Sequence, residues 1–248
     1  MNGLIWTIYG VILLYFALGG AGFYVINRKR PKAEARKSYL KYFTYFAIIN
    51  IVVLSIVFPP LFRYLTLVVI GAGYYELWRS GRQKAAANRP GTPAGWFILF
   101  SLFFVGFYLF SGLPSDTVLY VFMITSIFDS FSQISGQLWG RRKILPRISP
   151  NKTLGGTVGG GMIAFGSGFL LNSLYGGTES ERLILTAGVI VFSFAGDALA
   201  SGYKRWCGVK DFSRLIPGHG GVLDRFDSLI AAGSWSVLYL SAILYMNI

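Results

Sequence analysis

Long apolar runs dominate the chain, and short polar segments separate them. The runs lie at roughly 4–26, 42–58, 61–78, 95–112, 117–136, 156–175, 183–201 and 228–246. They are continuous rather than alternating, which is typical of helices and not of membrane β-strands. Several approach the roughly 20 residues that a helix needs to cross the hydrocarbon core of a bilayer. The pattern therefore predicts an all-α, polytopic membrane protein with about eight transmembrane helices.

Composition agrees with this pattern and excludes several kinds of protein. Of the 248 residues, 54% are hydrophobic and 13% are charged, whereas about 25% of the residues of a soluble domain are charged. The single Cys excludes an internal disulfide, and the single His excludes a metal site built from several histidines. We therefore expect no separate soluble domain, no disulfide and no histidine cluster.

The basic residues alternate from loop to loop. Nearly all of the 23 lysines and arginines lie in the loops 27–41, 79–94, 137–155 and 202–227, and the exceptions are Arg63 and Arg182. Because basic loops stay in the cytoplasm, this asymmetry predicts a protein of the cell (inner) membrane with both termini outside. The net charge of +13 then reflects topology and attraction to anionic lipid headgroups, and it does not indicate nucleic-acid binding.

One polar stretch, 196–227, carries most of the candidate chemistry. In a chain with ten acidic residues, it holds Asp197, Asp211, Asp224 and Asp227, the only His (His219), and the basic residues Lys204, Arg205, Lys210, Arg214 and Arg225. Carboxylates can hold Mg²⁺, which usually shares its oxygen ligands with substrate phosphates. Lysine and arginine side chains bind phosphate oxygens. The stretch therefore predicts a metal and polyphosphate site at the membrane surface.

Helical spacing groups these residues further. Ser201, Lys204 and Arg205 follow Asp197 on roughly one helix face. The alternative is a basic helix end that snorkels to the interface and contains an internal ion pair. Asp224 and Asp227 are three residues apart at the start of the last run; they suit a metal site, or they simply favour the helix dipole.

A Gly-rich loop and a second polar loop add candidate ligand-binding groups. Pro217-Gly218-His219-Gly220-Gly221 allows the backbone to approach a ligand closely, and His219 could be a base, a phosphate donor or a capping residue. The loop 149–153 ends at Thr153, a candidate N-cap of the next helix. With Lys152 beside it, that helix start is a candidate anion site.

Acidic residues within apolar runs are a separate signal, because charges there are costly and usually functional. Asp129 precedes a polar stripe, which predicts either a watery cavity or a hydrogen-bonded packing network. Glu76 lies near a helix end, three residues before Arg79. For Glu76 we expect an interfacial ion pair with Arg79 rather than catalysis.

The stretch from Ser201 to Asp227 closely resembles the signature of the phosphatidate cytidylyltransferase (CDP-diacylglycerol synthase) family. That signature has Ser, Lys-Arg, Lys-Asp, Pro-Gly-His-Gly-Gly and Asp-Arg-x-Asp at these spacings. Ser149-Pro150-Asn151-Lys152-Thr153 resembles the second motif of the family, and residues 129–136 loosely resemble another. The resemblance covers about the last half of the chain. We therefore expect catalytic helices over 93–248, with the site at the cytoplasmic face, and N-terminal helices of unassigned role over 1–92.

The resemblance implies an activity and a set of site residues. It implies transfer of CMP from CTP to phosphatidate, giving CDP-diacylglycerol and pyrophosphate for phospholipid biosynthesis, with Mg²⁺ and K⁺ as candidate cations. It implies catalytic Asp197, Lys204, Asp224 and Asp227, the three acids among them binding metal, with Asp211 and Asp129 as further candidates. It implies substrate or phosphate contacts from Ser149, Lys152, Thr153, Ser201, Arg205, Lys210, His219 and Arg225. A homodimer is a further expectation.

The chain departs from the family pattern at two acidic positions. Gly155 and Ala200 stand where the family usually has Glu, and Ser132 and Gln133 replace an Ala and a Tyr. The chain is thus expected to be a divergent member that lacks two of the usual glutamates. Alternatives therefore stay open at this point: another lipid phosphate as the acceptor, a CTP-dependent lipid kinase, or a catalytically silent lipid-binding protein with the same fold.

Overall fold

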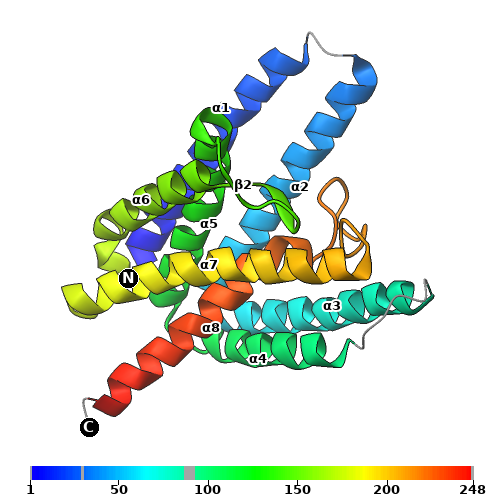
Figure 1. The fold of residues 1–248 in the computed structure, drawn as a ribbon. Helices are drawn as coiled ribbons and strands as arrows, with labels where there is room; N and C mark the ends of the chain where they lie inside the picture. The colour runs from blue at the N-terminus through cyan, green and yellow to red at the C-terminus, as the bar shows by residue number, and fades with distance from the viewer. Residues whose placement is uncertain (1, 29–30, 87–92, 247–248) are drawn as a thin grey trace.

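The computed structural model describes residues 2–28, 31–86 and 93–246, which form eight α-helices and one short hairpin (Figure 1). The helices are α1 (Asn2–Asn27), α2 (Lys32–Val57), α3 (Pro59–Ala86), α4 (Ala94–Phe110), α5 (Ser115–Trp139), α6 (Leu154–Leu170), α7 (Glu179–Cys207) and α8 (Leu223–Met246), with a 3₁₀ turn, η1 (Asn172–Leu174). Each predicted apolar run lies mainly in one helix. The expected all-α class is therefore confirmed.

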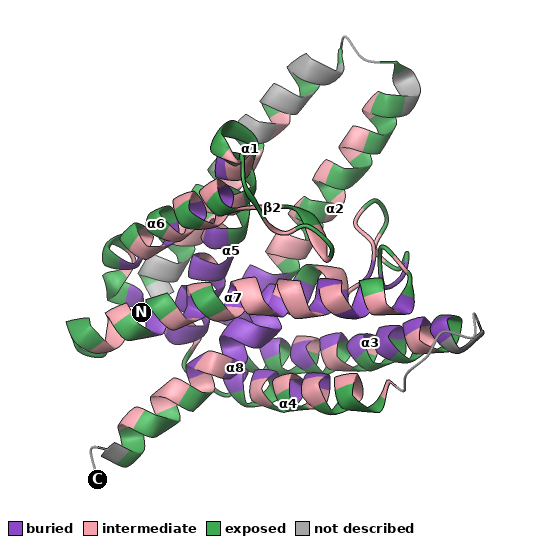
Figure 2. Cartoon of the chain, in the orientation of Figure 1, coloured by how far each residue is buried: buried purple, intermediate pink, exposed green. Residues whose placement is uncertain are grey.

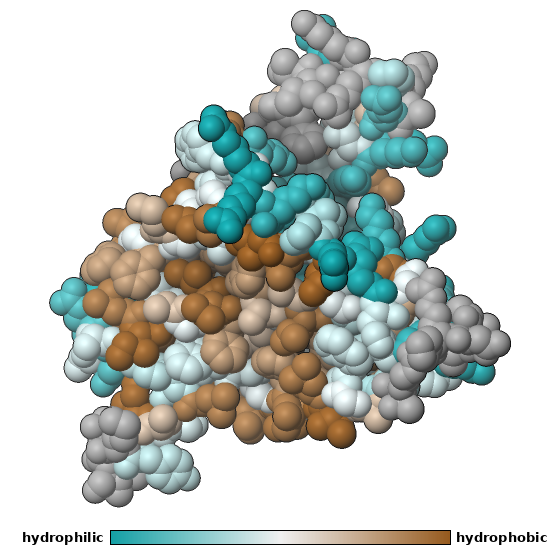
Figure 3. Space-filling view, viewed as in Figure 1, coloured by the Kyte–Doolittle hydropathy of each residue, from teal (hydrophilic) through white to brown (hydrophobic). Residues whose placement is uncertain are grey.

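Four described helices are long and apolar enough to cross a membrane, within Glu34–Val57, Ser115–Trp139, Glu179–Cys207 and Leu223–Tyr245, whereas Ala94–Phe110 and Leu154–Leu170 are apolar but shorter. The surface agrees with a lipid environment. On α4, Ile98, Leu102 and Val105 are 60–67% exposed, a stripe that water would disfavour. Figure 3 shows hydrophobic surface over much of the molecule and hydrophilic residues gathered toward one end. The count of eight spans stays a prediction.

The segment before α6 is not the plain loop that the sequence suggests. Strands β1 (Lys143–Leu145) and β2 (Ser149–Thr153) pair in an antiparallel hairpin. At the end of β2, the Thr153 hydroxyl accepts a hydrogen bond from the Gly156 N–H, at 3.2 Å, and caps α6 as predicted. The hairpin thus holds Lys152 in an extended segment directly before a helix N-terminus.

The helices meet in one crossing region, where the buried residues are concentrated (Figure 2). Helix α7 crosses α8, α5 packs against α6, and α3 and α4 run side by side beneath α7 in the view of Figure 1. At the α7–α8 crossing, a Cβ on Gly196 would lie 2.7 Å from the Ala231 Cβ. This glycine therefore lets α7 and α8 approach closely beside Asp197 and Asp227.

Small residues on α6 allow a close contact with α5. Gly156 and Gly160 are buried, and a Cβ on Gly160 would lie 2.7 Å from the Ser132 Cα of α5. Gly166, on the same helix, has nothing within 4 Å of its Cβ position. The glycines therefore bring α6 against α5 within one chain, so they are not evidence for a dimer.

We expect Gly160→Ala to destabilise the protein by about 1–3 kcal/mol, because the methyl group must push α6 away from α5. Thermal unfolding of the purified protein in detergent measures the effect. Gly166→Ala is the matched control and should be neutral or stabilising, since Ala is the better helix former. Equal melting temperatures for the two variants would contradict the close packing.

Candidate functional site

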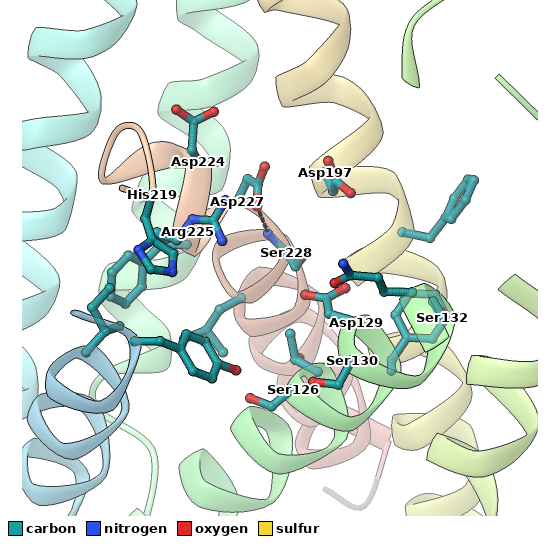
Figure 4. A pocket seen from close by; sticks show the side chains of 18 of the residues that line it. Ser126, Asp129, Ser130, Ser132, Asp197, His219, Asp224, Arg225, Asp227 and Ser228 are labelled. Atoms are coloured by element: carbon teal, nitrogen blue, oxygen red, sulfur yellow. Dashed lines mark hydrogen bonds between the residues drawn. The ribbon is translucent and has the colours of Figure 1, made fainter. Parts of the chain in front are cut away.

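One cavity of about 690 Å³ is lined by many of the predicted polar residues (Figure 4). Its walls come from α2, α5, α6, α7 and α8, from the hairpin, and from the loop between α7 and α8. Among the described residues it is lined by the acids Asp129, Asp197, Asp211, Asp224 and Asp227 and by Lys152, Lys204, His219 and Arg225. Segments separated by up to about three-quarters of the chain therefore meet at one place.

Asp197 links α7 to the hairpin. Its Oδ2 atom lies 2.8 Å from Lys152 Nζ, and its Oδ1 atom accepts a hydrogen bond from the Ser201 hydroxyl at 3.2 Å. Lys152 Nζ also donates to the Phe194 carbonyl at 3.3 Å. The hydrogen bond with Ser201 joins residues four apart on one helix face, as the sequence predicts. The ion pair with Lys152 joins two motifs that are far apart in the sequence.

Asp224 links α8 to α7 and organises the loop between them. Its Oδ1 atom accepts from Lys204 Nζ at 2.6 Å, and its Oδ2 atom accepts from the N–H groups of Phe212 and Gly221, both at 2.9 Å. The side chains of Lys204 and Asp224 are only 10% and 4% exposed. Because removal of either partner leaves the other charge buried, this pair is costly to break.

Asp129 and Asp227 complete the acidic part of the cavity. Asp227 Oδ1 accepts from the N–H of Ser228 at 2.9 Å. Each of these carboxylates also experiences the negative charge of Asp197, and Figure 4 shows all three beside the same space. Within the described part of the chain, no ion pair is formed by Asp129 or Asp227. Their mutual repulsion therefore favours a bound cation.

This donor set fits a hard cation such as Mg²⁺, since every candidate ligand is a carboxylate oxygen. The described residues contain no ready-made group of three or more His, Cys, Asp or Glu side chains at metal-binding separation. Mg²⁺ is usually held by one or two carboxylates together with substrate phosphates. One or two of Asp197, Asp227 and Asp129 would supply the carboxylates, and the rest of the coordination would come from substrate and water.

Several predicted phosphate-binding residues lie outside this cavity. Arg205 donates to the Ile148 and Val209 carbonyls, at 3.1 and 3.2 Å, and so ties the hairpin to the end of α7. Lys210 lines a separate cavity of about 430 Å³ with Arg79 and Arg214. Ser149 begins β2, and Thr153 caps α6. Phosphate contacts from Ser149, Thr153, Arg205 and Lys210 stay predictions.

His219 lies where the Gly-rich loop meets α2. Its ring stacks on that of Tyr45, with centroids 6.3 Å apart and an interplanar angle of 15°. Gly218 and Gly220 have φ values of 77° and 85°, which favour glycine. Burial lowers the pKa of His219 from its ordinary value of 6.5; a hydrogen bond with the Pro217 carbonyl opposes this effect, and the charges of Arg225 and Lys41 reinforce it. The neutral ring is therefore favoured.

Glu76 is the residue whose role the sequence did not reveal. The expected ion pair with Arg79 is wrong, because Glu76 is fully buried and accepts hydrogen bonds from three donors in the polar stretch 196–227. The donors are the Ser213 hydroxyl at 2.5 Å, the Val222 N–H at 2.9 Å and the Leu223 N–H at 2.7 Å. In the sequence, only the position of an acid within an apolar run indicated a special role for Glu76. Local spacing could not identify its partners, because they are about 140 residues away.

Close packing accommodates the two positions that depart from the family pattern. A Cβ on Gly155 would lie 2.9 Å from the Trp139 carbonyl oxygen. Ala200 on α7 has no exposed surface. A glutamate at Gly155 would have to displace the end of α5, and one at Ala200 would be buried. The small residues at both positions therefore agree with the packing around them.

Comparison with known proteins places these motifs in a family. The profile described as "Cytidylyltransferase family" matches residues 114–243. Proteins named phosphatidate cytidylyltransferase are 43% identical over 121 residues in Haemophilus influenzae, covering 46% of this chain and 42% of the relative, and 38% identical over 150 residues in Staphylococcus haemolyticus, covering 58% of each. One in Brucella abortus is 38% identical over 174 residues, which is 66% of this chain and 58% of the relative. The chain spans about half the length of the curated relatives it matches.

We expect the stability contribution of His219 to depend on pH. Since the folded-state pKa is lower than the unfolded value, the unfolded chain binds more protons as the pH falls through 6.5, and the free energy of unfolding decreases. The melting temperature of the protein minus that of His219→Gln should therefore decrease between about pH 7.5 and about pH 5. Carboxylate titration is common to both proteins and cancels. A constant difference would contradict the neutral, partly buried ring.

Proposed function

The chain belongs to the cytidylyltransferase family, and we propose that it transfers CMP from CTP to phosphatidate, forming CDP-diacylglycerol and pyrophosphate. The family match includes α5 to α8, the helices that carry most of the acids and Lys204. The relatives named phosphatidate cytidylyltransferase match 46–66% of the chain at 38–43% identity. Both findings support the nucleotidyl transfer, and the shape of the cavity supports a lipid acceptor.

We infer a lipid acceptor because the charged cavity adjoins an apolar groove. The groove has a volume of about 500 Å³ and is lined by residues of α1, α2 and α5 and by His219. It shares Tyr45, Ile49, Phe122, Ser126 and His219 with the charged cavity. An acceptor with a phosphate group and acyl chains would occupy both spaces at once. A soluble phosphate acceptor would leave the groove without a role.

The chemistry requires few protein groups. A phosphate oxygen of the acceptor attacks the α-phosphorus of CTP, the bond from that phosphorus to the bridging oxygen breaks, and pyrophosphate leaves with the electron pair. The attacking oxygen is already anionic, so no strong base is needed. The main barrier is the approach of two anions, which fixed positive charges lower. Lys152, Lys204 and Arg225 line the cavity and would supply these charges.

The acids have a complementary role. Asp197 and Asp224 hold Lys152 and Lys204 at 2.8 and 2.6 Å, which fixes the ammonium groups in place before substrate binds. Bound Mg²⁺ would neutralise phosphate charge, with one or two of Asp197, Asp227 and Asp129 as its protein ligands in our proposal. K⁺ is a further candidate cation for the same acidic centre. Ser201 orients Asp197 through their hydrogen bond.

The placement of the site in the cell follows from the same proposal. The hairpin and the α7–α8 loop, which carry basic residues, meet at the C-terminal end of α7, away from the end of α8 (Figure 1). We propose that this end faces the cytoplasm, where CTP is available, and that the lipid enters from the inner leaflet. Both termini are then outside. A homodimer stays a prediction that rests on the family resemblance.

We expect the purified protein to release pyrophosphate from CTP only when Mg²⁺ and phosphatidate are both present in mixed micelles. Asp227→Asn should reduce the rate by about 100- to 1,000-fold, because a carboxylate that faces the reacting phosphates becomes neutral. Coupled detection of pyrophosphate, with and without K⁺, measures the rate. Pyrophosphate release without phosphatidate, or an Asp227→Asn variant as active as the parent, would overturn the assignment.

The same assay separates the other candidate functions. A lipid kinase would give CDP and a phosphorylated lipid instead of pyrophosphate and a CDP-lipid. A transferase with another acceptor would release pyrophosphate only with that lipid phosphate. A silent protein would release none with any acceptor, and it would contradict our proposal.

The groove predicts a dependence on acyl chains. Ile49→Trp, placed where the groove joins the cavity, should lower the ratio of kcat/KM for long-chain over short-chain phosphatidate about tenfold, because the indole takes the space of the long chain. Leu102→Trp is the matched control, since Leu102 is 67% exposed on the outer face of α4. An unchanged ratio in Ile49→Trp would remove the groove from the acceptor site.

A further inference from the structure

Glu76 belongs to α3, which lies outside the matched region 114–243. Its carboxylate nevertheless contacts the start of α8, where Asp224 and Asp227 begin their helix. We propose that Glu76 is a positioning residue, which anchors the first turn of α8 and so fixes these two acids relative to α7. This inference rests on the proposed function, because it gives those acids their catalytic importance.

The anchoring follows from how the carboxylate is satisfied. Glu76 has no exposed surface and takes part in no ion pair among the described residues. Its three hydrogen bonds come from Ser213, Val222 and Leu223. The last two donors are free N–H groups at the start of a helix, where the helix dipole also favours a negative charge. A buried charge with these partners holds the helix start firmly, since any displacement leaves it unpaired.

Through Glu76 and the neighbouring Leu77, α3 contacts both α7 and α8, and we call this pair of contacts the brace. The carbonyl of Leu77 accepts a hydrogen bond from the Tyr203 hydroxyl of α7 at 2.7 Å, and both residues are fully buried. Tyr203 directly precedes Lys204, the partner of Asp224. Adjacent positions of α3 thus hold α7 and α8 at the level of the Lys204–Asp224 ion pair. Glu76 is the charged part of that brace.

Gly221 packs directly against the Glu76 carboxylate. A Cβ on Gly221 would lie 2.7 Å from the Glu76 Cδ atom, so glycine is required for the carboxylate to reach the N–H groups of Val222 and Leu223. Gly221 also donates its own N–H to Asp224. The loop therefore passes between two carboxylates, Glu76 on one side and Asp224 on the other, and both hold the start of α8.

The test compares Glu76→Gln with Ser80→Ala. Gln keeps the size of Glu but directs an amide N–H₂ at one of the backbone donors. Ser80 is the matched control because it is one turn further along α3 and is fully buried, and its hydroxyl makes no hydrogen bond. We expect Glu76→Gln to lower kcat about 10- to 100-fold and to raise the Mg²⁺ concentration that gives half-maximal rate. Ser80→Ala should keep the parent value of both.

The Mg²⁺ dependence distinguishes positioning from a loss of stability. A protein that is only destabilised has fewer active molecules, but each responds to Mg²⁺ as the parent does. Reduced activity with an unchanged half-maximal Mg²⁺ concentration would therefore overturn the proposal, as would parental activity. Ser213→Ala removes one of the three donors and serves if Glu76→Gln fails to fold. It should shift the Mg²⁺ concentration in the same direction by a smaller factor, and an unchanged value in the folded variant would overturn the proposal.

Hydrogen–deuterium exchange provides a readout that needs no activity. The amides of residues 212–223 should exchange faster in Glu76→Gln than in the parent, and at the parent rate in Ser80→Ala. An unchanged rate in Glu76→Gln would overturn the anchoring itself. If the parent released no pyrophosphate, the proposed function would fail, and the exchange rates would still decide whether Glu76 holds α8 in place.

Discussion

The buried ion pair between Lys204 and Asp224 is the interaction on which the rest of the site depends. Its side chains are 10% and 4% exposed, and its atoms lie 2.6 Å apart. Such a pair is stable only when the remaining oxygen atoms are also hydrogen-bonded. Phe212 and Gly221 provide those bonds, so the loop between α7 and α8 folds around Asp224. The pair therefore fixes the helix crossing and the loop together.

The other acids differ in how far they are compensated. Asp197 is paired with Lys152, whereas Asp129 and Asp227 have no basic partner within the described residues. Uncompensated charge away from water is costly, and buried charges are usually paired or bound to a metal. The same cavity thus combines ion pairs, which organise the fold, with carboxylates that form no ion pair among the described residues and would bind a cation together with substrate phosphates.

The N-terminal helices contribute more than an anchor in the membrane. Helix α2 supplies Tyr45 and Ile49 to the cavity and the groove, and α3 supplies Glu76 and Leu77 to the brace behind α7 and α8. The matched family region begins at residue 114, so these contributions come from the part of the chain that the motifs do not cover. The division between residues 92 and 93, which the sequence suggested, stays a prediction, and residues from both sides of it line the cavity.

The sequence by itself determined the features that depend on local spacing. Continuous apolar runs predicted the helices, four-residue spacing predicted the contact of Asp197 with Ser201, and Thr153 was identified as a cap, because the geometry of a helix fixes which nearby residues meet. Only the tertiary structure decided the contacts of Lys152 with Asp197 and of Glu76 with α8. These partners are far apart in the chain, and which of them meet depends on how the helices cross.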